Sequence, residues 1–179
     1  MPSISKSDAD SGGQMKRTPF RLMILALLGS GAILSFGNAA ASRPPDLSGT
    51  WNADLAKSSF AAGAARPKRW SVTIQQDERK LVRTETFVGQ DDKASGVTMT
   101  FTLDGKENRN RIEELDLFTA CRWEGRSLII EGTLRSDPAG IWTEKLTLSP
   151  DGKRLRATSS IRFPGGQSNE TDITYTRGN

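Results

Sequence analysis

The chain has 179 residues, a net charge of +4, 35% hydrophobic and 26% charged residues, one cysteine and no histidine. The absence of histidine excludes Ser-His and Cys-His nucleophiles, imidazole bases and the usual zinc and copper ligand sets. Cys121 cannot form an internal disulfide and is more simply a small buried hydrophobe than a reactive thiol. We therefore expect no metal, no cofactor and no enzymatic activity.

A leader pattern occupies residues 1–41. Starting from Met15, basic residues precede an apolar run over residues 22–36, and small residues follow it up to Ala41. This pattern predicts a signal peptide with an extended basic region, cleaved before Ser42, and hence a periplasmic or secreted domain over residues 42–179. The run is 15 residues long, shorter than the roughly 20 that span a bilayer. We expect no membrane span after cleavage, and a retained anchor is the alternative.

Loss of the leader would also remove much of the positive charge. It leaves 21 basic and 19 acidic residues, a net charge of +2, so a nucleic-acid partner is not expected. A basic stripe formed by Arg154, Arg156 and Arg162 is more simply a solvated strand face with cross-strand ion pairs than a phosphate-binding track.

From Trp70 to the C-terminus, apolar residues recur with a period of two. The clearest case is Val97, Met99, Phe101 and Leu103, which alternate with threonines and predict a strand with one apolar face. The same period appears in five later runs, which lie at 115–123, 128–134, 142–148, 155–163 and 173–175. The long gap from Asn52 to Arg69 predicts a loop with at most one helical turn, which is either a lid over a barrel end or a surface loop of no special purpose.

Seven turn signals separate these runs. They fall at residues 77–80, 91–93, 104–108, 124–126, 137–140, 150–153 and 164–167. Such even punctuation predicts an all-β fold, an antiparallel meander that closes into a small barrel.

The last two hairpins allow a prediction of register. A loop over residues 150–153 pairs Leu148 with Leu155 and Trp142 with Ile161, so that inward residues meet inward partners. Across the following loop, we expect Arg162 to pair with Glu170, with Asp172 nearby.

The segment from Asp46 to Trp51 contains Gly49-Thr50-Trp51, which resembles the Gly-x-Trp opening of the lipocalin-like (calycin) barrels. The resemblance implies an up-and-down barrel of about eight strands whose floor is closed by Trp51, with an arginine of the last strand over its ring. Arg177 is the matching residue, and a guanidinium over an indole is stabilising. Segments such as 46–60 and 148–155 also resemble uncharacterised secreted bacterial proteins with barrels of this type.

Inward-facing polar and aromatic residues are the candidate ligand contacts. Glu144 is placed on the inner face opposite Ser159, where an unpaired carboxylate would be costly. We expect it to bind a ligand, to form a salt bridge near the rim or to reach solvent at a barrel mouth, and a register shift of one residue is the remaining alternative. The candidate ligand-binding residues are Trp70, Met99, Phe101, Trp123, Trp142, Glu144 and Ser159, and the structural floor is Gly49, Trp51 and Arg177.

These features favour a lipocalin-like protein that binds a small apolar or amphipathic ligand inside the barrel. The alternative is a protein-binding or inhibitor module whose barrel is filled by side chains and whose loops contact a partner. The acidic cluster of Glu113, Glu114 and Asp116 has no identifiable second carboxylate at a defined separation, so glycoside chemistry is not expected.

Overall fold

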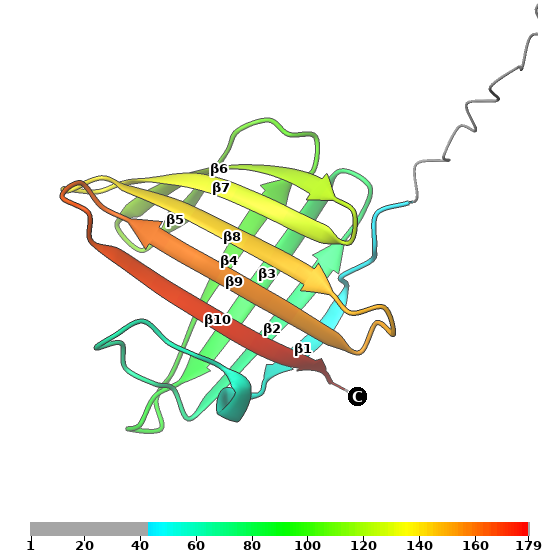
Figure 1. The fold of residues 1–179 in the computed structure, drawn as a ribbon, viewed down its shortest axis with the longest axis horizontal. Helices are drawn as coiled ribbons and strands as arrows, with labels where there is room; N and C mark the ends of the chain where they lie inside the picture. The colour runs from blue at the N-terminus through cyan, green and yellow to red at the C-terminus, as the bar shows by residue number, and fades with distance from the viewer. Residues whose placement is uncertain (1–42, 179) are drawn as a thin grey trace, which may run out of the picture. The chain divides into compact units, whose positions relative to one another are not determined.

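The computed structural model describes residues 43–178, which form ten β-strands and one short 3₁₀ turn (Figure 1). The strands are β1 (Gly49–Ala53), β2 (Arg69–Gln76), β3 (Lys80–Val88), β4 (Ala94–Thr102), β5 (Asn108–Ile112), β6 (Leu115–Glu124), β7 (Ser127–Arg135), β8 (Gly140–Leu148), β9 (Arg154–Arg162) and β10 (Ser168–Arg177), and the 3₁₀ turn is η1 (Leu55–Lys57). Within this part of the chain no helix has the length and hydropathy to cross a bilayer.

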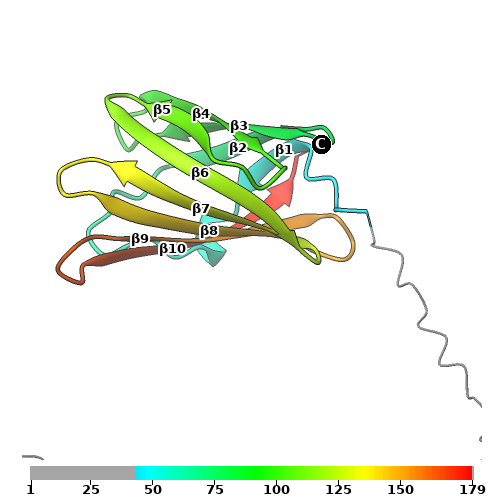
Figure 2. The ribbon, with the colours of Figure 1, turned by 90° about the horizontal axis from the view of Figure 1, so that it is seen from above.

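All strands belong to one antiparallel meander, and β1 pairs with β10 so that the sheet rolls up. The order is β4-β3-β2-β1-β10-β9-β8-β7-β6-β5, which leaves β4 and β5 as the two edges. Figures 1 and 2 show two curved layers, with β1–β4 crossing behind β6–β10. The result is a nearly closed barrel, as the sequence predicted.

The number of strands is ten instead of about eight. The expected number came from the resemblance, and β5 gave little signal of its own. Four of its five residues are Asn108, Arg109, Asn110 and Arg111, so it lacks the apolar alternation that identified the other strands.

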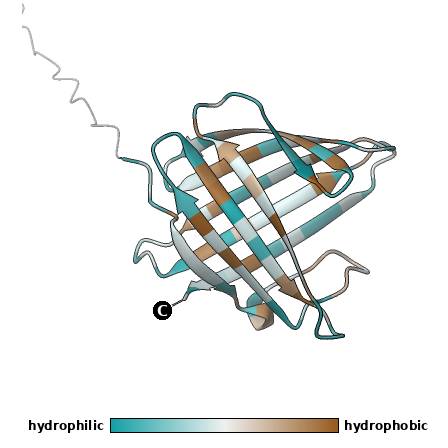
Figure 3. Cartoon of the chain, turned by 180° about the vertical axis from the view of Figure 1, so that it is seen from behind, coloured by the Kyte–Doolittle hydropathy of each residue, from teal (hydrophilic) through white to brown (hydrophobic). Residues whose placement is uncertain are grey.

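Period-two alternation places one apolar face of each strand inside the barrel. In β4, Met99 and Phe101 are buried while the threonines between and beside them are partly or fully exposed. Hydrophobic and hydrophilic bands alternate along the strands in Figure 3. Burial of these apolar faces, at about 25 cal/mol per Å² removed from water, is the main favourable contribution to folding.

The β8–β9 register is confirmed. Leu148 pairs with Leu155, Trp142 with Ile161 and Glu144 with Ser159. Inward residues therefore face inward residues along the whole hairpin.

The predicted β9–β10 register is wrong by two residues. Arg162 pairs with Ser168 instead of Glu170, because Phe163 and Gln167 already close a tight turn over Gly165 and Gly166, both of which have positive φ. A shift of two residues keeps every side chain on its predicted face.

The ion pair on this outer face is correspondingly different. Arg156, not Arg162, contacts Asp172, with Nη2 and Oδ2 separated by 2.5 Å. The basic stripe carries an exposed cross-strand ion pair, and the pKa of Asp172 is lowered by its hydrogen bond to Arg156.

Side chains join the two edge strands where backbone pairing is missing. The carboxamide of Asn110 accepts a hydrogen bond from the amide of Thr100 (2.7 Å) and donates one to its carbonyl (2.8 Å). The side chain of Asn108 donates to the same carbonyl. A carboxamide offers the same donor and acceptor as a peptide group, so Asn110 replaces one rung of the ladder. We call this contact the seam.

Trp51 closes one end of the barrel, which we call the floor. The guanidinium carbon of Arg177 lies 4.2 Å from the centre of the indole ring, and the indole N–H donates to the carbonyl of Leu47 (2.9 Å). Arg177 also donates to the carbonyls of Ser48 (2.6 Å) and Gly152 (3.0 Å). The Arg177 side chain thus covers the indole ring and links the end of β10 to the start of β1 and to the β8–β9 turn.

The long loop between β1 and β2 lies at the other end, which we call the mouth. Ser59 exchanges backbone hydrogen bonds with Asp172 of β10. Lys68 forms an ion pair of 2.8 Å with Asp92 in the β3–β4 turn, and Gln90 donates to the carbonyl of Arg66. The loop is therefore attached to the barrel on both sides.

Replacement of Asn110 by alanine should destabilise the fold by about 1–3 kcal/mol, because it leaves the amide of Thr100 without its acceptor and the carbonyl of Thr100 with only the hydrogen bond from Asn108. Urea unfolding measures the loss, and hydrogen exchange at the Thr100 amide should accelerate. Asn169→Ala, at an exposed position near the start of β10, is the control and should change stability by less than about 0.5 kcal/mol. Equal effects of the two changes would contradict the role of the seam.

Gly49→Ala should also be destabilising, for two reasons. Gly49 has a φ of +129°, and an added Cβ would lie 2.7 Å from Nη1 of Arg177. Gly63→Ala isolates the first effect, since its φ is +78° but its Cβ would meet nothing within 4 Å. We expect G49A to cost about 1–3 kcal/mol and G63A clearly less in thermal or urea unfolding. A larger loss for G63A would contradict this packing of the floor.

Candidate functional site

A buried ionic cluster crosses the interior of the barrel. Nη1 of Arg83 on β3 lies 2.6 Å from Oε2 of Glu144 on β8, and its Nη2 lies 3.0 Å from Oε1 of Glu85. Arg83 is 4% exposed, Glu85 7% and Glu144 8%. The Arg83–Glu144 pair therefore links the two layers of the barrel through its centre.

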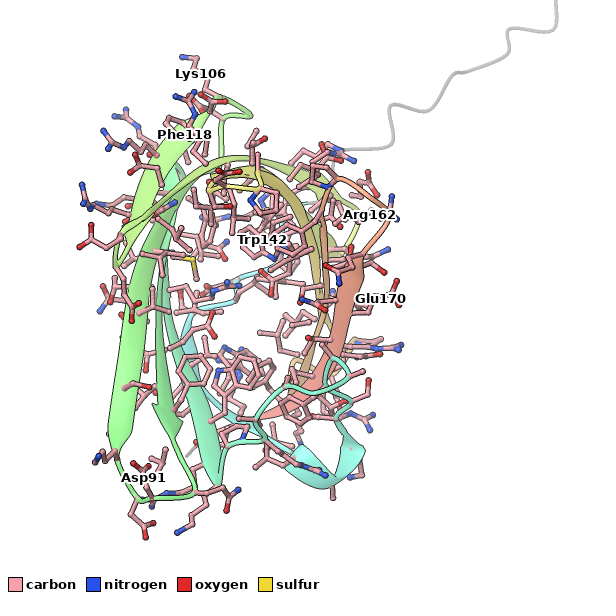
Figure 4. The ribbon with its side chains drawn as sticks, turned by 90° about the vertical axis from the view of Figure 1, so that its left-hand side faces the viewer. Asp91, Lys106, Phe118, Trp142, Arg162 and Glu170 are labelled. Carbon is pink, nitrogen blue, oxygen red and sulfur yellow. The ribbon has the colours of Figure 1, made fainter. Side chains whose placement is uncertain are left out.

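Aromatic rings surround this cluster. The guanidinium carbon of Arg83 lies 5.2 Å from the ring centre of Phe101 and 5.8 Å from that of Trp142, and the two rings are 6.3 Å apart. Figure 4, a view between the two layers, shows Trp142 in the interior. The indole N–H of Trp70 donates to Glu85 Oε2 (3.0 Å), which extends the cluster toward the mouth.

Burial and mutual charge determine the protonation of the cluster. Desolvation raises the pKa of Glu144 above its ordinary value, the charge of Glu85 adds to the effect, and the attraction of Arg83 opposes it without cancelling it. Burial lowers the pKa of Arg83, but Glu144 and Glu85 outweigh it and raise that pKa above its ordinary value. Arg83 therefore remains charged, with two carboxyl groups to balance it.

One donor of the cluster has no partner. Nε of Arg83 is buried and makes no hydrogen bond with any residue among 43–178. An unsatisfied buried donor of a charged group costs about 1–3 kcal/mol or more. A hydrogen-bond acceptor next to Arg83 Nε would therefore be stabilising.

An apolar pocket of about 680 Å³ lies at the mouth. Phe60 of the long loop, Trp70 of β2 and Phe87 of β3 supply its aromatic lining. Trp70 and Phe87 are Cα partners with ring centres 4.8 Å apart, and the ring of Phe60 is 6.2 Å from that of Trp70. This volume is in the range of small-molecule sites in proteins.

Charged residues form the rim of the mouth pocket. Arg66 lies over the ring of Phe60 at 5.5 Å, and Lys93 forms an ion pair of 3.4 Å with Asp91. All four of these residues line the pocket. The pocket thus combines an aromatic interior with a polar opening, which suits an apolar or amphipathic molecule.

Two further pockets are more polar or smaller. One of about 750 Å³ lies at the floor end and includes Trp123, Leu103 and Gln76. One of about 360 Å³ lies between β4 and the β5–β6 turn and includes Val97 and Ile112. Each has a single aromatic residue in its lining, whereas the mouth pocket has three, so the mouth pocket is the better candidate site for an apolar ligand.

The residues predicted to contact a ligand lie in three places. Trp70 lines the mouth pocket and Trp123 the floor pocket. The others point into the interior, where Met99, Phe101, Trp142 and Glu144 are buried and Ser159 is half-buried. None of the three pockets is lined by Met99, Trp142 or Leu128, which are buried in the core.

Sequence reasoning missed Arg83 and Glu85. Both alternate with Leu81 and Phe87 on the inward face of β3, which is a detectable signal. It was masked because Val82 and Val88 give the opposite face an apolar pattern too. The mouth residues Phe60 and Arg66 belong to the long loop, where no regular alternation of apolar residues indicates which side chains point toward the barrel.

Comparison with known proteins supports the fold. No family model and no curated protein matches the sequence. Among solved structures, the chain is similar to an ileal bile acid-binding protein of zebrafish complexed with cholic acid, with 17% identity and a TM-score of 0.50 over 73% of this chain and 98% of that one. It is also similar to secretory abundant heat soluble protein 4 of Ramazzottius varieornatus, with 16% identity and a TM-score of 0.51 over 74% and 95%, respectively.

These similarities show the architecture, a calycin-like, nearly closed antiparallel barrel. Residues 43–178 contain no group of three or more His, Cys, Asp or Glu side chains that could hold a metal ion. Cys121 is buried, and desolvation raises its pKa to about 12, so its thiol is protonated at neutral pH. The predicted signal peptide at residues 1–41 lies outside the described residues.

The raised pKa of Glu144 predicts a pH-dependent contribution to stability. Because the folded protein binds this proton more tightly than the unfolded chain, the contribution is present below the ordinary pKa of 4.5 and is lost as the pH rises through the raised pKa. Glu144→Gln cannot titrate and retains an acceptor for Arg83. We expect E144Q to gain stability relative to the wild type as the pH rises above about 4.5, measured by urea unfolding across pH 4–9.

Glu131→Gln is the matched control, since Glu131 is exposed on β7 and pairs with Arg122 at 2.8 Å. The E131Q profile should run parallel to that of the wild type. A constant difference between E144Q and the wild type at all pH values would show that Glu144 does not carry this effect.

Proposed function

We propose that the protein is a non-enzymatic, lipocalin-like binding protein that holds a small apolar or amphipathic molecule at the mouth of its barrel. The observation that carries this proposal is the pocket of about 680 Å³ with its lining of Phe60, Trp70 and Phe87. Aromatic side chains provide large apolar contact areas with few rotatable bonds, which favours the binding of apolar molecules.

The rim gives the pocket an amphipathic character. The apolar part of a ligand would contact the three rings, and its polar end would face either the rim with Arg66 and Lys93 or the ionic cluster behind Trp70. The zebrafish neighbour, which is named for bile acid binding, has a similar fold and is compatible with this proposal.

We further propose that the protein acts in the periplasm or is secreted. The support comes from the sequence, in which basic residues precede the apolar run at 22–36 and small residues follow. The resemblance to secreted bacterial proteins with such barrels points the same way.

A protein-binding or inhibitor module is the second candidate. It is favoured by the interior of the barrel, where Arg83, Glu144, Phe101 and Trp142 meet and fill the centre. In that case the loops at the mouth would contact the partner, and the mouth pocket would accept a partner side chain.

Binding of the neutral fluorescent probe N-phenyl-1-naphthylamine tests the first candidate. We expect saturable binding with an affinity reduced about tenfold by Phe60→Ala, because this change removes ring contact of roughly 1.5 kcal/mol. Fluorescence titration measures both values. Phe118→Ala, on the outer face of β6 beneath Arg135, is the control and should bind as the wild type does. Absence of saturable binding would favour the second candidate.

A further inference from the structure

The buried cluster of Arg83, Glu85 and Glu144 has features that a purely structural ion pair does not need. It contains two carboxyl groups for one guanidinium, and Arg83 Nε has no acceptor among residues 43–178 although the Arg83 side chain is almost fully buried. Burial of an excess charge and of an unpaired donor is costly, and an apolar core of similar volume would avoid both costs.

The cluster begins one inward-facing position beyond the mouth pocket along β3. Phe87, which lines the pocket, is followed on the inward face of β3 by Glu85 and then Arg83. At about 3.3 Å per residue, Arg83 is roughly 13 Å along the strand from Phe87. Trp70 lines the same pocket and donates to Glu85. A ligand that enters between the rings therefore approaches the cluster with its leading end.

We propose that the cluster selects ligands whose leading end is an uncharged hydroxyl group. This inference rests on the proposed function. A hydroxyl oxygen accepts a hydrogen bond from Arg83 Nε, and its proton can be donated to an oxygen of Glu85 or Glu144. One group thus satisfies the orphan donor and faces the carboxyl groups without adding charge.

The other common head groups fit less well. A carboxylate would satisfy Nε, but it would bring a third negative charge close to Glu85 and Glu144 in a site where charges are poorly screened. An ammonium group would be attracted by the carboxylates, yet it has no acceptor for Nε and would lie beside the guanidinium. The rings of Phe101 and Trp142 already pack against the guanidinium, so the apolar tail of a ligand would lie in the mouth pocket.

The test compares three molecules with the same tail, 1-decanol, decanoate and decylamine, as competitors of N-phenyl-1-naphthylamine at pH 8. We expect decanol to displace the probe with the highest affinity and decanoate to be at least about 30-fold weaker, because two like charges about 8 Å apart or closer repel by about 2 kcal/mol or more at an effective dielectric constant near 20. Glu144→Gln should narrow this gap, because Arg83 and Glu85 then balance each other. Glu131→Gln removes an exposed carboxylate and should leave the gap unchanged.

The Nε–H resonance of Arg83 in ¹⁵N spectra of the wild-type protein gives a direct measurement that needs no variant. It should shift on saturation with decanol, since a hydrogen bond forms at this atom. Equal affinities of the three molecules, tighter binding of decanoate or decylamine, or an unmoved resonance would overturn the inference while leaving the proposed function intact. Failure of the probe itself to bind would overturn both.

Discussion

The ion pair between Arg83 and Glu144 is the contact on which the arrangement of the interior depends, because it joins β3 to β8 across the barrel. Both partners are almost fully buried, and the loss of Arg83 would leave two carboxyl groups in an apolar surrounding without their counter-charge. The rings of Phe101 and Trp142 pack around the guanidinium and fix its position. The centre of the interior is therefore packed around this pair, and the mouth pocket lies beyond it on the side of Trp70.

The two ends of the barrel are built for different tasks. At the floor, Arg177 covers Trp51 and hydrogen-bonds to carbonyl groups on both sides, which closes that end with a rigid contact. At the mouth, the long loop is attached through Ser59 and Lys68 and leaves an aromatic pocket beside Trp70. A closed floor and an open mouth are the features expected of a container that is entered from one side.

Much of the fold could be predicted from the sequence, because apolar and polar residues alternate along a strand that has one buried and one solvent-exposed face. The β8–β9 register, which pairs Trp142 with Ile161, followed directly from the loop at residues 150–153. β5 was missed because its polar residues serve the seam, where Asn110 replaces a backbone rung. Arg83 was missed because charged residues on an inward face contradict the pattern used to find that face, and its partner Glu144 is distant in sequence.

The most direct test of this account is a crystal structure of the protein with a saturating neutral apolar ligand such as 1-decanol. The account predicts electron density for the tail between Phe60, Trp70 and Phe87, with the ligand's oxygen toward Arg83. A ligand bound at the floor end or on the outer wall, with the mouth closed by its own side chains, would contradict it.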